Sequence, residues 1–312
     1  MNILVSGSVA YDVIMDFPGS FKDHILPDKI HMLNVSFLVD GLRRNFGGTA
    51  GNIAYNLSLL GEKSTILASV GRDFDRYKEW LHQNNIDTSH INVLPDEDTA
   101  VAHMITDQSN NQIIAFYAGA MQYACGPIQG KFVTDDVFGI VAPGYKDEMV
   151  AYPTYYRKNG ISFIFDPGQQ TSTLSSDELR QGMKGAKIVI VNDYEWALLL
   201  QKTGMTEEDV LVVVDMVIVT LGEKGSRVIT QAERLDIPAV QNLSVKDPTG
   251  AGDAYRAGLI KGLNMQWSID IVCRFASVVA AYVVEEHGTQ VHAFTFDDVL
   301  KRYKEAYGNE IK

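Results

Sequence analysis

Short, almost wholly apolar runs recur along this chain and alternate with stretches of helical spacing. Most of the runs end in Gly, Asp or Asn, and they span residues 2–7, 64–71, 138–144, 162–168, 187–193 and 216–222. Continuous apolar runs are typical of parallel strands buried on both faces, whereas strands that face water on one side alternate apolar and polar residues. Repeated strand–helix units therefore predict an α/β fold with a mostly parallel sheet covered by helices.

The expected helices fill the gaps between these runs. They lie around residues 49–60, 73–84, 146–158, 176–184, 193–202 and 206–211. After Thr249 the pattern changes to helices alone, around 251–264, 268–286 and 295–307. Ligands of open α/β sheets bind beyond the carboxyl ends of the strands, so polar motifs that follow a predicted strand are the first candidates for a site.

Two regions, 13–46 and 90–120, interrupt the alternation. The second contains two runs of period 2 joined by "QSNN", a pattern typical of a β-hairpin. Together the two regions predict a small, mainly β lid beside the α/β body. We therefore expect residues 1–312 to form one domain whose lid comes from about 13–46 and 90–120. An exposed hydrophobic strand of such a lid would offer a surface for a homodimer.

The bulk composition restricts the class of partner. The chain has 27 basic and 39 acidic residues, a formal net charge of -12. Such an acidic surface argues against nucleic acid or an anionic membrane as the main partner. Two cysteines, Cys125 and Cys273, cannot build a disulfide framework, and no apolar run reaches the roughly 18 residues of a membrane span. With no signal-peptide pattern at its start, the sequence favours a cytoplasmic protein.

The segment "DPTGAGDAYRAG", Asp247 to Gly258, places small residues at the expected start of a helix. A helix N-terminus offers unpaired N–H groups and a partial positive charge, and glycines let an oxyanion approach them closely. The turn at Gly250, Ala251 and Gly252 therefore reads as an anion cradle. A carboxylate beside it, Asp253, is electrostatically unfavourable unless it receives a proton, as a general base does in phosphoryl transfer.

A purely structural interpretation of this turn is also open. Asp253 could cap the helix, and the glycines could make a close packing turn. The added Asp247 and Thr249 and the small helix face made by Ala254, Ala257 and Gly258 favour the functional interpretation. A Walker-type phosphate loop is excluded, because G-x-x-x-x-G-K-[ST] does not occur in the sequence.

"DPTGAGDAYRAG" resembles the D-x-T-G-A-G-D signature of the PfkB/ribokinase-like carbohydrate and nucleoside kinases. The resemblance implies a ribokinase-like three-layer α/β/α sandwich with a mostly parallel central sheet and a small β lid. It also implies that Asp253 is the catalytic base and that Gly250, Ala251 and Gly252 form the anion hole. ATP and Mg²⁺ would be required. Asp247 and Thr249 match the region where many members bind a monovalent cation such as K⁺.

A second glycine-rich helix start, "GGTAGNIAYNLSLLG" at 47–61, is similar to the other signature of this family. Taken alone it reads as a tight strand–helix turn, but the resemblance implies that Gly48 and Asn52 hold substrate hydroxyls. "SGSVAYD" follows the first strand and ends at Asp12, whose carboxylate suits a vicinal diol. The resemblance implies that Asp12 binds the sugar, although the residue could equally belong to a turn.

Two further motifs point to the nucleotide. In "NDYEW", Asn192 and Glu195 stand three residues apart at a helix start, which is typical of a capping box. The same spacing resembles the family's N-x-x-E motif, in which the Glu supports Mg²⁺ through water; both interpretations can hold together. "TLGEKGS" resembles the nucleotide loop, so Thr220, Gly222 and Gly225 would line the ATP site, although alone it is a hairpin-turn signal.

Several segments look like the bacterial adenosine kinases of this fold, among them "SFLVD", "FYAGAM" and "DPGQQ". In that subgroup a lid aromatic stacks on the purine, and Phe116 is the candidate here, with Phe37 and Phe46 as alternates. Phe116 could instead be an inward residue of the hairpin. Further substrate contacts are expected from three polar residues: Ser8, Ser36 and Gln170.

Arg256, one turn beyond Asp253, could stabilise charge in the transition state or pair with an acidic neighbour. The sequence thus predicts an ATP-dependent kinase that phosphorylates the 5′-hydroxyl of a nucleoside, with adenosine as the first candidate. A kinase for ribose, fructose or another nucleoside is the alternative. A non-catalytic ligand-binding protein on the same fold is disfavoured, because both Asp253 and the anion turn are retained.

Overall fold

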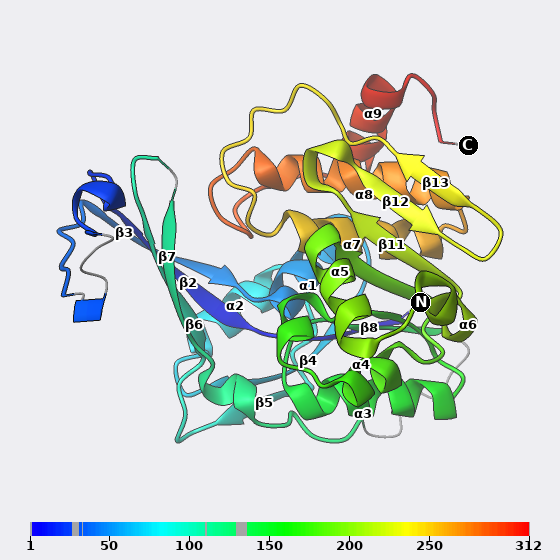
Figure 1. Cartoon of the computed structure of the whole chain (residues 1–312), viewed down its shortest axis with the longest axis horizontal. Helices are drawn as coiled ribbons and strands as arrows, with labels where there is room; N and C mark the ends of the chain where they lie inside the picture. The colour runs from blue at the N-terminus through cyan, green and yellow to red at the C-terminus, as the bar shows by residue number, and fades with distance from the viewer. Residues whose placement is uncertain (1, 27–30, 33, 110, 129–135, 312) are drawn as a thin grey trace.

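A nine-stranded sheet runs through the centre of the molecule in the order β13-β12-β11-β10-β9-β8-β1-β4-β5 (Figure 1). The computed structural model describes residues 2–26, 31–32, 34–109, 111–128 and 136–311. All neighbours from β11 to β5 are parallel, and β12 and β13 add an antiparallel edge. The strands are β1 Asn2–Ser6, β4 Ser64–Gly71, β5 Ile91–Leu94, β8 Val137–Val141, β9 Ser162–Phe165, β10 Ile188–Asn192, β11 Met216–Thr220, β12 Ser226–Ile229 and β13 Arg234–Ile237.

Helices cover both faces of this sheet. On one face lie α1 Thr49–Leu59, α2 Asp75–Gln83, α7 Ala251–Asn264, α8 Ile269–Val284 and α9 Phe296–Tyr307, and on the other lie α3 Lys146–Lys158, α4 Ser176–Met183, α5 Asp193–Thr203 and α6 Glu207–Val213. The three-layer α/β/α arrangement expected from the sequence is therefore confirmed.

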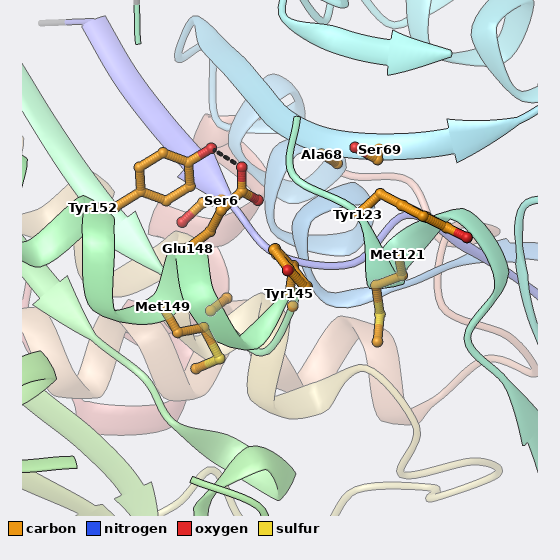
Figure 2. Close-up of a pocket in the computed structure, with 12 residues that line it drawn as sticks. Ser6, Ala68, Ser69, Met121, Tyr123, Tyr145, Glu148, Met149 and Tyr152 are labelled. Carbon is orange, nitrogen blue, oxygen red and sulfur yellow. Dashed lines mark hydrogen bonds between the residues drawn. The ribbon is translucent and has the colours of Figure 1, made fainter. Parts of the chain in front are cut away.

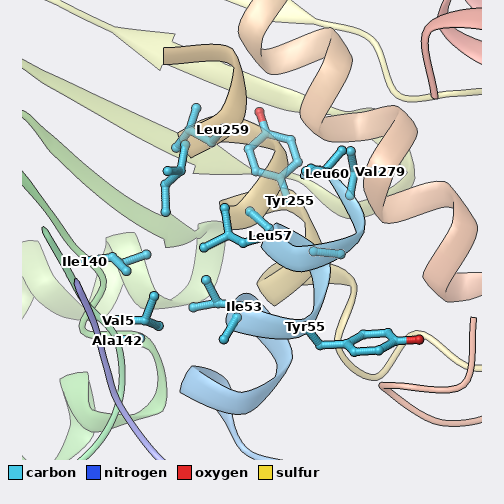
Figure 3. Close-up of a cluster of buried hydrophobic side chains, with 14 of the residues drawn as sticks. Val5, Ile53, Tyr55, Leu57, Leu60, Ile140, Ala142, Tyr255, Leu259 and Val279 are labelled. Carbon is cyan, nitrogen blue, oxygen red and sulfur yellow. The ribbon is translucent and has the colours of Figure 1, made fainter. Parts of the chain in front are cut away.

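The side-chain alternation along β1 explains why the middle of the strand, residues 3–5, is apolar. Ile3 and Val5 point into the core beneath α1, α7 and α8, while Leu4 between them points into the core beneath α3 and α4. Figure 3 shows the first core, where Val5 lies near Ile53 of α1. A strand buried on both faces cannot carry a polar side chain without a partner. Ile3, Leu4 and Val5 are therefore apolar, and the buried Ser6 donates its hydroxyl to the Ile140 carbonyl at 3.0 Å.

Two predicted strands end earlier than expected. The runs 138–144 and 162–168 contain Pro143 and Pro167, and the strands stop at Val141 and Phe165. Proline has no N–H to donate to a neighbouring strand, so each ladder ends before it. The residues after each strand then turn toward the edge where the polar motifs gather.

A second, smaller sheet has the order β3-β2-β6-β7 and projects from the body (Figure 1). Its strands are β2 Ala10–Asp16, β3 Gly41–Gly47, β6 Ala100–Thr106 and β7 Gln112–Tyr117. The lid and its predicted β6–β7 hairpin are thereby confirmed. The lid begins at Ala10 rather than 13, and 91–94, which was expected in the lid, pairs with β4 as an edge strand of the large sheet. Residues 27–30, 33 and 110 of the expected lid lie outside the described residues.

Within the described ranges, no helix is both long and apolar enough to cross a membrane.

Candidate active site

The glycine turn of the signature forms the start of α7, as the sequence predicted. Gly250 is the N-cap residue with φ of 81°, a left-handed conformation that glycine adopts without strain. A Cβ at Gly250 would also lie 2.9 Å from Cγ2 of Thr289. The Ala251 N–H donates to the Pro248 carbonyl (3.2 Å), whereas no described residue accepts from the N–H groups of Gly252 and Asp253. These two donors remain available to an anion.

Asp253 lies in the first turn of α7 and on the wall of a cleft of about 450 Å³. Burial raises the pKa of Asp253 to about 6, while a hydrogen bond from Asn52 and the Arg256 guanidinium oppose that rise. A carboxylate with this pKa is ionised at neutral pH and still basic enough to accept a proton from a hydroxyl. The geometry therefore suits the role of general base.

Arg256 is committed to an ion pair. Its Nε and Nη2 atoms donate to the two carboxylate oxygens of Asp166 at 2.5 and 2.8 Å, and both residues are buried. Its Nη1 donates to the Gly252 carbonyl at 3.0 Å. Of the two roles considered from the sequence, the structure shows the pairing. Arg256 therefore ties the anion turn to the segment after β9 and stiffens it.

The second glycine-rich motif opens α1 opposite α7. Gly48 is the N-cap residue with φ of 86°, and a Cβ there would lie 2.6 Å from the Ser8 carbonyl oxygen. Asn52 is buried on the first turn of α1, and its Nδ2 donates to Asp253 Oδ2 at 2.8 Å. This bond to the candidate base was not foreseen from the sequence, where Asn52 was assigned to a substrate hydroxyl; that assignment stays a prediction.

Asp12 lies on lid strand β2, beyond the carboxyl end of β1 and facing α7. Burial, followed by the negative charges of Asp253 and Asp247, raises the pKa of Asp12 to about 7. Those two carboxylates act on Asp12 only because the base of the lid brings it close to them. The structure thus gathers Asp12, Asn52 and Asp253 from three separate motifs at one place.

The predicted nucleotide motifs line the other side of the cleft. Asn192, Glu195, Thr220 and Gly222 all border the same space as Asp253. Asn192 and Glu195 form a capping box at α5, with Asn192 Oδ1 accepting from the Glu195 N–H at 2.7 Å and Glu195 Oε2 from the Asn192 N–H at 2.8 Å. Burial raises the pKa of Glu195, although the Asn192 N–H opposes the rise. The capping role is therefore confirmed.

A larger, mainly apolar cavity of about 620 Å³ adjoins this cleft and shares Thr220, Gly222 and Gly252 with it. Gly225, with φ of 96°, forms part of its wall. Sequence reasoning missed the segment 239–243 and the α8 residues that complete the wall. Their only signal was a run of small and apolar side chains, which is common in any core.

Of the three polar residues expected at the substrate, Ser8 and Gln170 both contact the segment after β8, and Ser36 lies in another loop. Ser8 is buried, and its Oγ accepts from the Thr49 N–H at 3.0 Å, which caps α1. Gln170 donates to the Gly144 carbonyl at 3.1 Å. Ser36 is exposed in the loop before β3. Ser8 and Gln170 thus have structural partners, and a substrate contact from any of the three stays a prediction.

The register of the lid decides between the three aromatic candidates. Asn45, Asp12, Ala102 and Phe116 are paired in one row across the four strands, so their side chains lie on the same face. Phe116 is 53% exposed on that face. Phe46 lies on the opposite face and stacks on Tyr77 and Trp80, and Phe37 packs on Phe17 and Phe21. Of the three, Phe116 is the one paired in the row of Asp12, and its stacking on a base stays a prediction.

A small pocket opens beside Gly7 and Gly144, at the carboxyl ends of β1, β4 and β8 (Figure 2). The Glu148 carboxylate accepts from the Tyr152 hydroxyl at 2.8 Å and from the Cys125 N–H at 2.7 Å. Burial raises the pKa of Glu148. The volume of this pocket, about 10 Å³, leaves room for a water molecule and not for a nucleobase.

Asp247 connects the anion turn to the loop after α8 by hydrogen bonds. Its Oδ1 accepts from the Thr249 N–H at 2.9 Å and its Oδ2 from the Gly288 N–H at 3.3 Å. A monovalent cation at Asp247 and Thr249 stays a prediction. Among the residues that the structure describes, no three His, Cys, Asp or Glu side chains converge as a metal site.

A family model described as pfkB family carbohydrate kinase matches residues 6–294. The chain belongs to this family. The matched range includes the lid, both glycine-rich motifs and the nucleotide loop, so the family assignment covers every part of the candidate site.

This pfkB-family chain is 31% identical over 272 residues to the nucleoside kinase of Methanocaldococcus jannaschii, a match that covers 86% of this chain and 89% of the relative. Two structures of Burkholderia thailandensis nucleoside kinase are also similar. The complex with inosine has a TM-score of 0.89 at 37% identity and covers 99% of both chains. The complex with ADP-inosine has a TM-score of 0.87 at 38% identity and covers 99% of this chain and 97% of the other.

These findings confirm the ribokinase-like fold and the reaction class expected from the motifs. The pfkB-family chain is a phosphotransferase that acts on a hydroxyl group, with ATP as donor, and its acceptor class is a nucleoside or a sugar.

Proposed function

We propose that this kinase transfers the terminal phosphoryl group of ATP to the 5′-hydroxyl of a nucleoside, with adenosine as the first candidate, and that Asp253 is the general base. The observation that carries the proposal is the shared lid face of Asp12 and Phe116, which is turned toward Asp253. One residue offers a carboxylate for two vicinal hydroxyls, and the other offers a flat ring for a base. The nucleoside kinases similar to this chain support the same acceptor class.

The lid arrangement favours a nucleoside over a free sugar. A free sugar would occupy Asp12 and leave the Phe116 ring without a partner. A nucleoside held by its ribose at Asp12 would extend its base along the row toward Phe116, two strands away. Stacking of a base on an aromatic ring contributes about 1–3 kcal/mol. Gly48 and Asn52, at the start of α1, stand where further ribose contacts are expected.

The chemistry follows from the residues around the anion turn. The Asp253 carboxylate takes the proton of the 5′-hydroxyl as the oxygen forms its bond to the terminal phosphorus, and the bond from that phosphorus to the β-phosphate oxygen breaks to release ADP. The anion turn at Gly250, Ala251 and Gly252 would face the charge on the transferred group. The N–H groups of Gly252 and Asp253 are its available donors, because the Ala251 N–H donates to the Pro248 carbonyl. Arg256 keeps this turn in place through its bonds to Asp166 and the Gly252 carbonyl.

We assign the donor nucleotide to the cleft formed by the 450 and 620 Å³ cavities. Thr220, Gly222 and Gly225 would contact it, and its base would enter the larger, apolar cavity. The carboxylate of Glu195 borders the phosphate end of this cleft, and carboxylate oxygens and water are the ligands that Mg²⁺ prefers. Mg²⁺ held there through water would neutralise charge on the phosphates.

The remaining parts of the proposal concern the lid and the loop after α8. We propose a single kinase domain whose lid closes over the nucleoside and excludes water, which suppresses hydrolysis of ATP. K⁺ near Asp247 and Thr249 would bind beside the anion turn and support its shape. The face of the lid turned away from Asp12 is proposed as the surface of a homodimer.

The test is ADP release from Mg·ATP with adenosine, inosine, guanosine, cytidine, ribose and fructose as acceptors. We expect turnover with nucleosides, adenosine first, and little with either free sugar. The variant D253N should lose at least about a hundred-fold in kcat, while nucleoside binding measured by calorimetry persists. Turnover of a free sugar alone would move the assignment to a sugar kinase, and near-normal turnover by D253N would reject Asp253 as base.

The lid contact is tested with two neighbouring aromatic residues of β7. Phe116→Ala removes the ring on the Asp12 face, and we expect KM for the nucleoside to rise roughly ten-fold or more, with a smaller effect on kcat. Tyr117→Ala is the matched control, because Tyr117 is 47% exposed on the opposite face. Equal effects of the two variants would contradict the stacking role of Phe116.

A further inference from the structure

Three side chains outside the signature of α7 lead by hydrogen bonds to Asp253: the partly buried Trp80 and the buried Gln290 and Asn52. We propose that Trp80 and Gln290 fix the orientation of Asn52, and that this chain of donors aims and ionises the Asp253 carboxylate. Trp80 and Gln290 are therefore positioning residues. The inference rests on the proposed role of Asp253 as general base and adds residues that the family motifs do not contain.

The donor chain comprises Trp80, Gln290, Asn52 and Asp253. The Trp80 indole Nε1 donates to Gln290 Oε1 at 3.0 Å, and Gln290 Nε2 donates to Asn52 Oδ1 at 2.9 Å. Asn52 Nδ2 then donates to Asp253 Oδ2 at 2.8 Å. The four residues come from α2, the loop after α8, α1 and α7. Each bond crosses between segments, so none is a by-product of helix geometry.

The direction of the donor chain is fixed at its beginning. The oxygen and nitrogen ends of an amide have nearly the same shape, so hydrogen-bond partners decide which end points where. An indole N–H can only donate, so Gln290 must turn its oxygen to Trp80. Its nitrogen then faces Asn52, whose oxygen must accept. The nitrogen of Asn52 is thereby left for Asp253.

Tyr77 provides an independent check on this direction. Its hydroxyl donates to the Gly47 carbonyl at 2.8 Å and accepts from Gln290 Nε2 at 2.6 Å. Reversing the Gln290 amide would place its oxygen against this hydroxyl, whose only hydrogen is already donated. Both partners of Gln290 therefore require the same orientation. A Cβ at Gly51 would lie 2.0 Å from the Tyr77 hydroxyl, so the third glycine of the α1 motif leaves room for this junction.

Burial makes each of these bonds matter. Tyr77, Gln290 and Asn52 are 0%, 3% and 4% exposed, so water cannot replace a lost partner. Stacked rings on either side hold the indole: Phe46 and Tyr55 lie 5.6 and 5.8 Å from the Trp80 ring centroid. The Trp80 indole, the first donor of the chain, is therefore held in place. Through its hydrogen bond it fixes the orientation of the Gln290 amide and, through that, of the Asn52 amide.

The consequence falls on the base. Burial raises the pKa of Asp253, and the Asn52 hydrogen bond is the leading opposing influence. An inverted Asn52 would present an oxygen to the carboxylate, raise its pKa further and turn it away from the acceptor hydroxyl. The other groups facing Asp253 are Arg256, Asp166, Asp12 and the Tyr77 hydroxyl, and the variants below leave all four in place.

The experiment compares Trp80→Phe and Gln290→Met with the wild type in the pH dependence of kcat at saturating adenosine or inosine. Each variant places an apolar side chain in most of the same space and removes the directing hydrogen bonds. We expect the acidic limb of kcat to move up by about half to one pH unit, so that kcat is about two- to five-fold lower at pH 6 and within two-fold of wild type at pH 8.5. Saturating nucleoside keeps Asp12 occupied and its titration out of the profile.

Trp267→Phe is the matched control, because Trp267 packs on Phe275 and Phe296, away from the site. Its kcat profile should coincide with that of the wild type. A uniform loss of kcat at every pH in the Trp80 and Gln290 variants, or an unshifted acidic limb, would overturn the positioning role. If D253N is inactive and the acidic limb of kcat is unshifted in the Trp80 and Gln290 variants, only the donor chain is rejected. If D253N is active, the role of Asp253 as base, on which the donor chain rests, is rejected.

Discussion

Asp12 and Asp253 are two half-buried carboxylates that act on each other electrostatically. The pKa of each is raised by burial, to about 7 and about 6. Asp253 has a hydrogen-bond donor in Asn52 and a nearby cation in Arg256, whereas no described residue donates a hydrogen bond to the Asp12 carboxylate. The negative charge of Asp12 is therefore less well stabilised than that of Asp253, and a substrate diol would supply the hydrogen-bond donors that Asp12 lacks.

The poorly stabilised charge of Asp12 predicts how Asp12→Asn changes the free energy of unfolding. The folded state binds a proton at Asp12 more tightly than the unfolded state, so the contribution of Asp12 to stability falls as pH rises from about 4 to about 7. Since Asp12 is partly shielded, we expect the variant to be about 1–2 kcal/mol more stable than the wild type at pH 8 and equal to it near pH 4. Urea unfolding of the ligand-free protein at both pH values measures this.

Asp16→Asn is the control for that prediction, because Asp16 lies on the same strand and forms an exposed ion pair with Arg43. Loss of this ion pair should lower the free energy of unfolding by less than about 1 kcal/mol, and Asp16→Asn should not stabilise the protein at pH 8. A D12N protein that is no more stable than D16N at pH 8 would contradict the account. The stabilising substitution should also raise KM for the nucleoside, because the diol loses its acceptor.

Residues inside local motifs could be predicted from the sequence, and residues that act across the chain could not. Gly250 and Asp253 are only three positions apart, so one short segment of sequence shows the chemistry of both. Gln290 lies 238 positions from Asn52, and Asp166 lies 90 from Arg256. A lone Gln or Asp carries no sequence signal of its partner, because the fold alone brings the two together.

At the scale of elements, four helices among the described residues begin with the same capping box, and one of them borders the cleft proposed for the nucleotide. The boxes at Asn192 of α5 and Thr295 of α9 have the same pattern of reciprocal bonds. Only the α5 box includes a residue, Glu195, that borders the cleft. The pair therefore separates the structural role of a cap from a role in binding Mg²⁺.

We expect Asn192→Ala and Thr295→Ala each to lower the free energy of unfolding by about 1 kcal/mol, because each removes one acceptor from a helix N-terminus. Asn192→Ala should also raise the Mg²⁺ concentration for half-maximal activity several-fold, because the Glu195 backbone loses its anchor. Thr295→Ala should leave that concentration unchanged. Denaturant unfolding and Mg²⁺ titration of the two variants measure both effects, and equal Mg²⁺ requirements would leave Asn192 with the capping role alone.

The elements buried on both faces could be predicted almost residue by residue, whereas edge elements could not. Runs such as 64–71 consist of apolar and small side chains, all of them buried, and the structure has β4 over those residues. The antiparallel strands β12 and β13, of which β13 is the edge of the sheet, have only four residues each and mix charged with apolar side chains. An edge strand is half exposed, so its sequence constrains it less and resembles that of a loop.

At the scale of the whole molecule, the lid sheet has two different faces. The Asp12 face turns toward α7 and the acceptor site. The opposite face has an unbroken apolar row across the four strands, made of Leu42, Met15, Ile105 and Ile113. Leu42 is 69% and Ile113 39% exposed, at the two edges of the sheet. A row of this kind is unfavourable in water and suits contact with an identical row.

The homodimer proposed through this face predicts a change of mass on substitution. Leu42→Glu and Ile113→Glu each place a charge in the contact, and two copies related by two-fold symmetry would bury two such charges. We expect the wild type to elute as a dimer in size-exclusion chromatography with light scattering, and the double variant as a single chain at the same concentration.

Val212→Glu is the control, because Val212 is 77% exposed on α6, far along the chain from the lid. A wild-type mass of one chain at every concentration, or a double variant that keeps the dimer mass, would show that the apolar row is not an interface. If the dimer forms, the variant should also raise KM for the nucleoside, since the same four strands carry Asp12 and Phe116 and a free lid samples open positions more often.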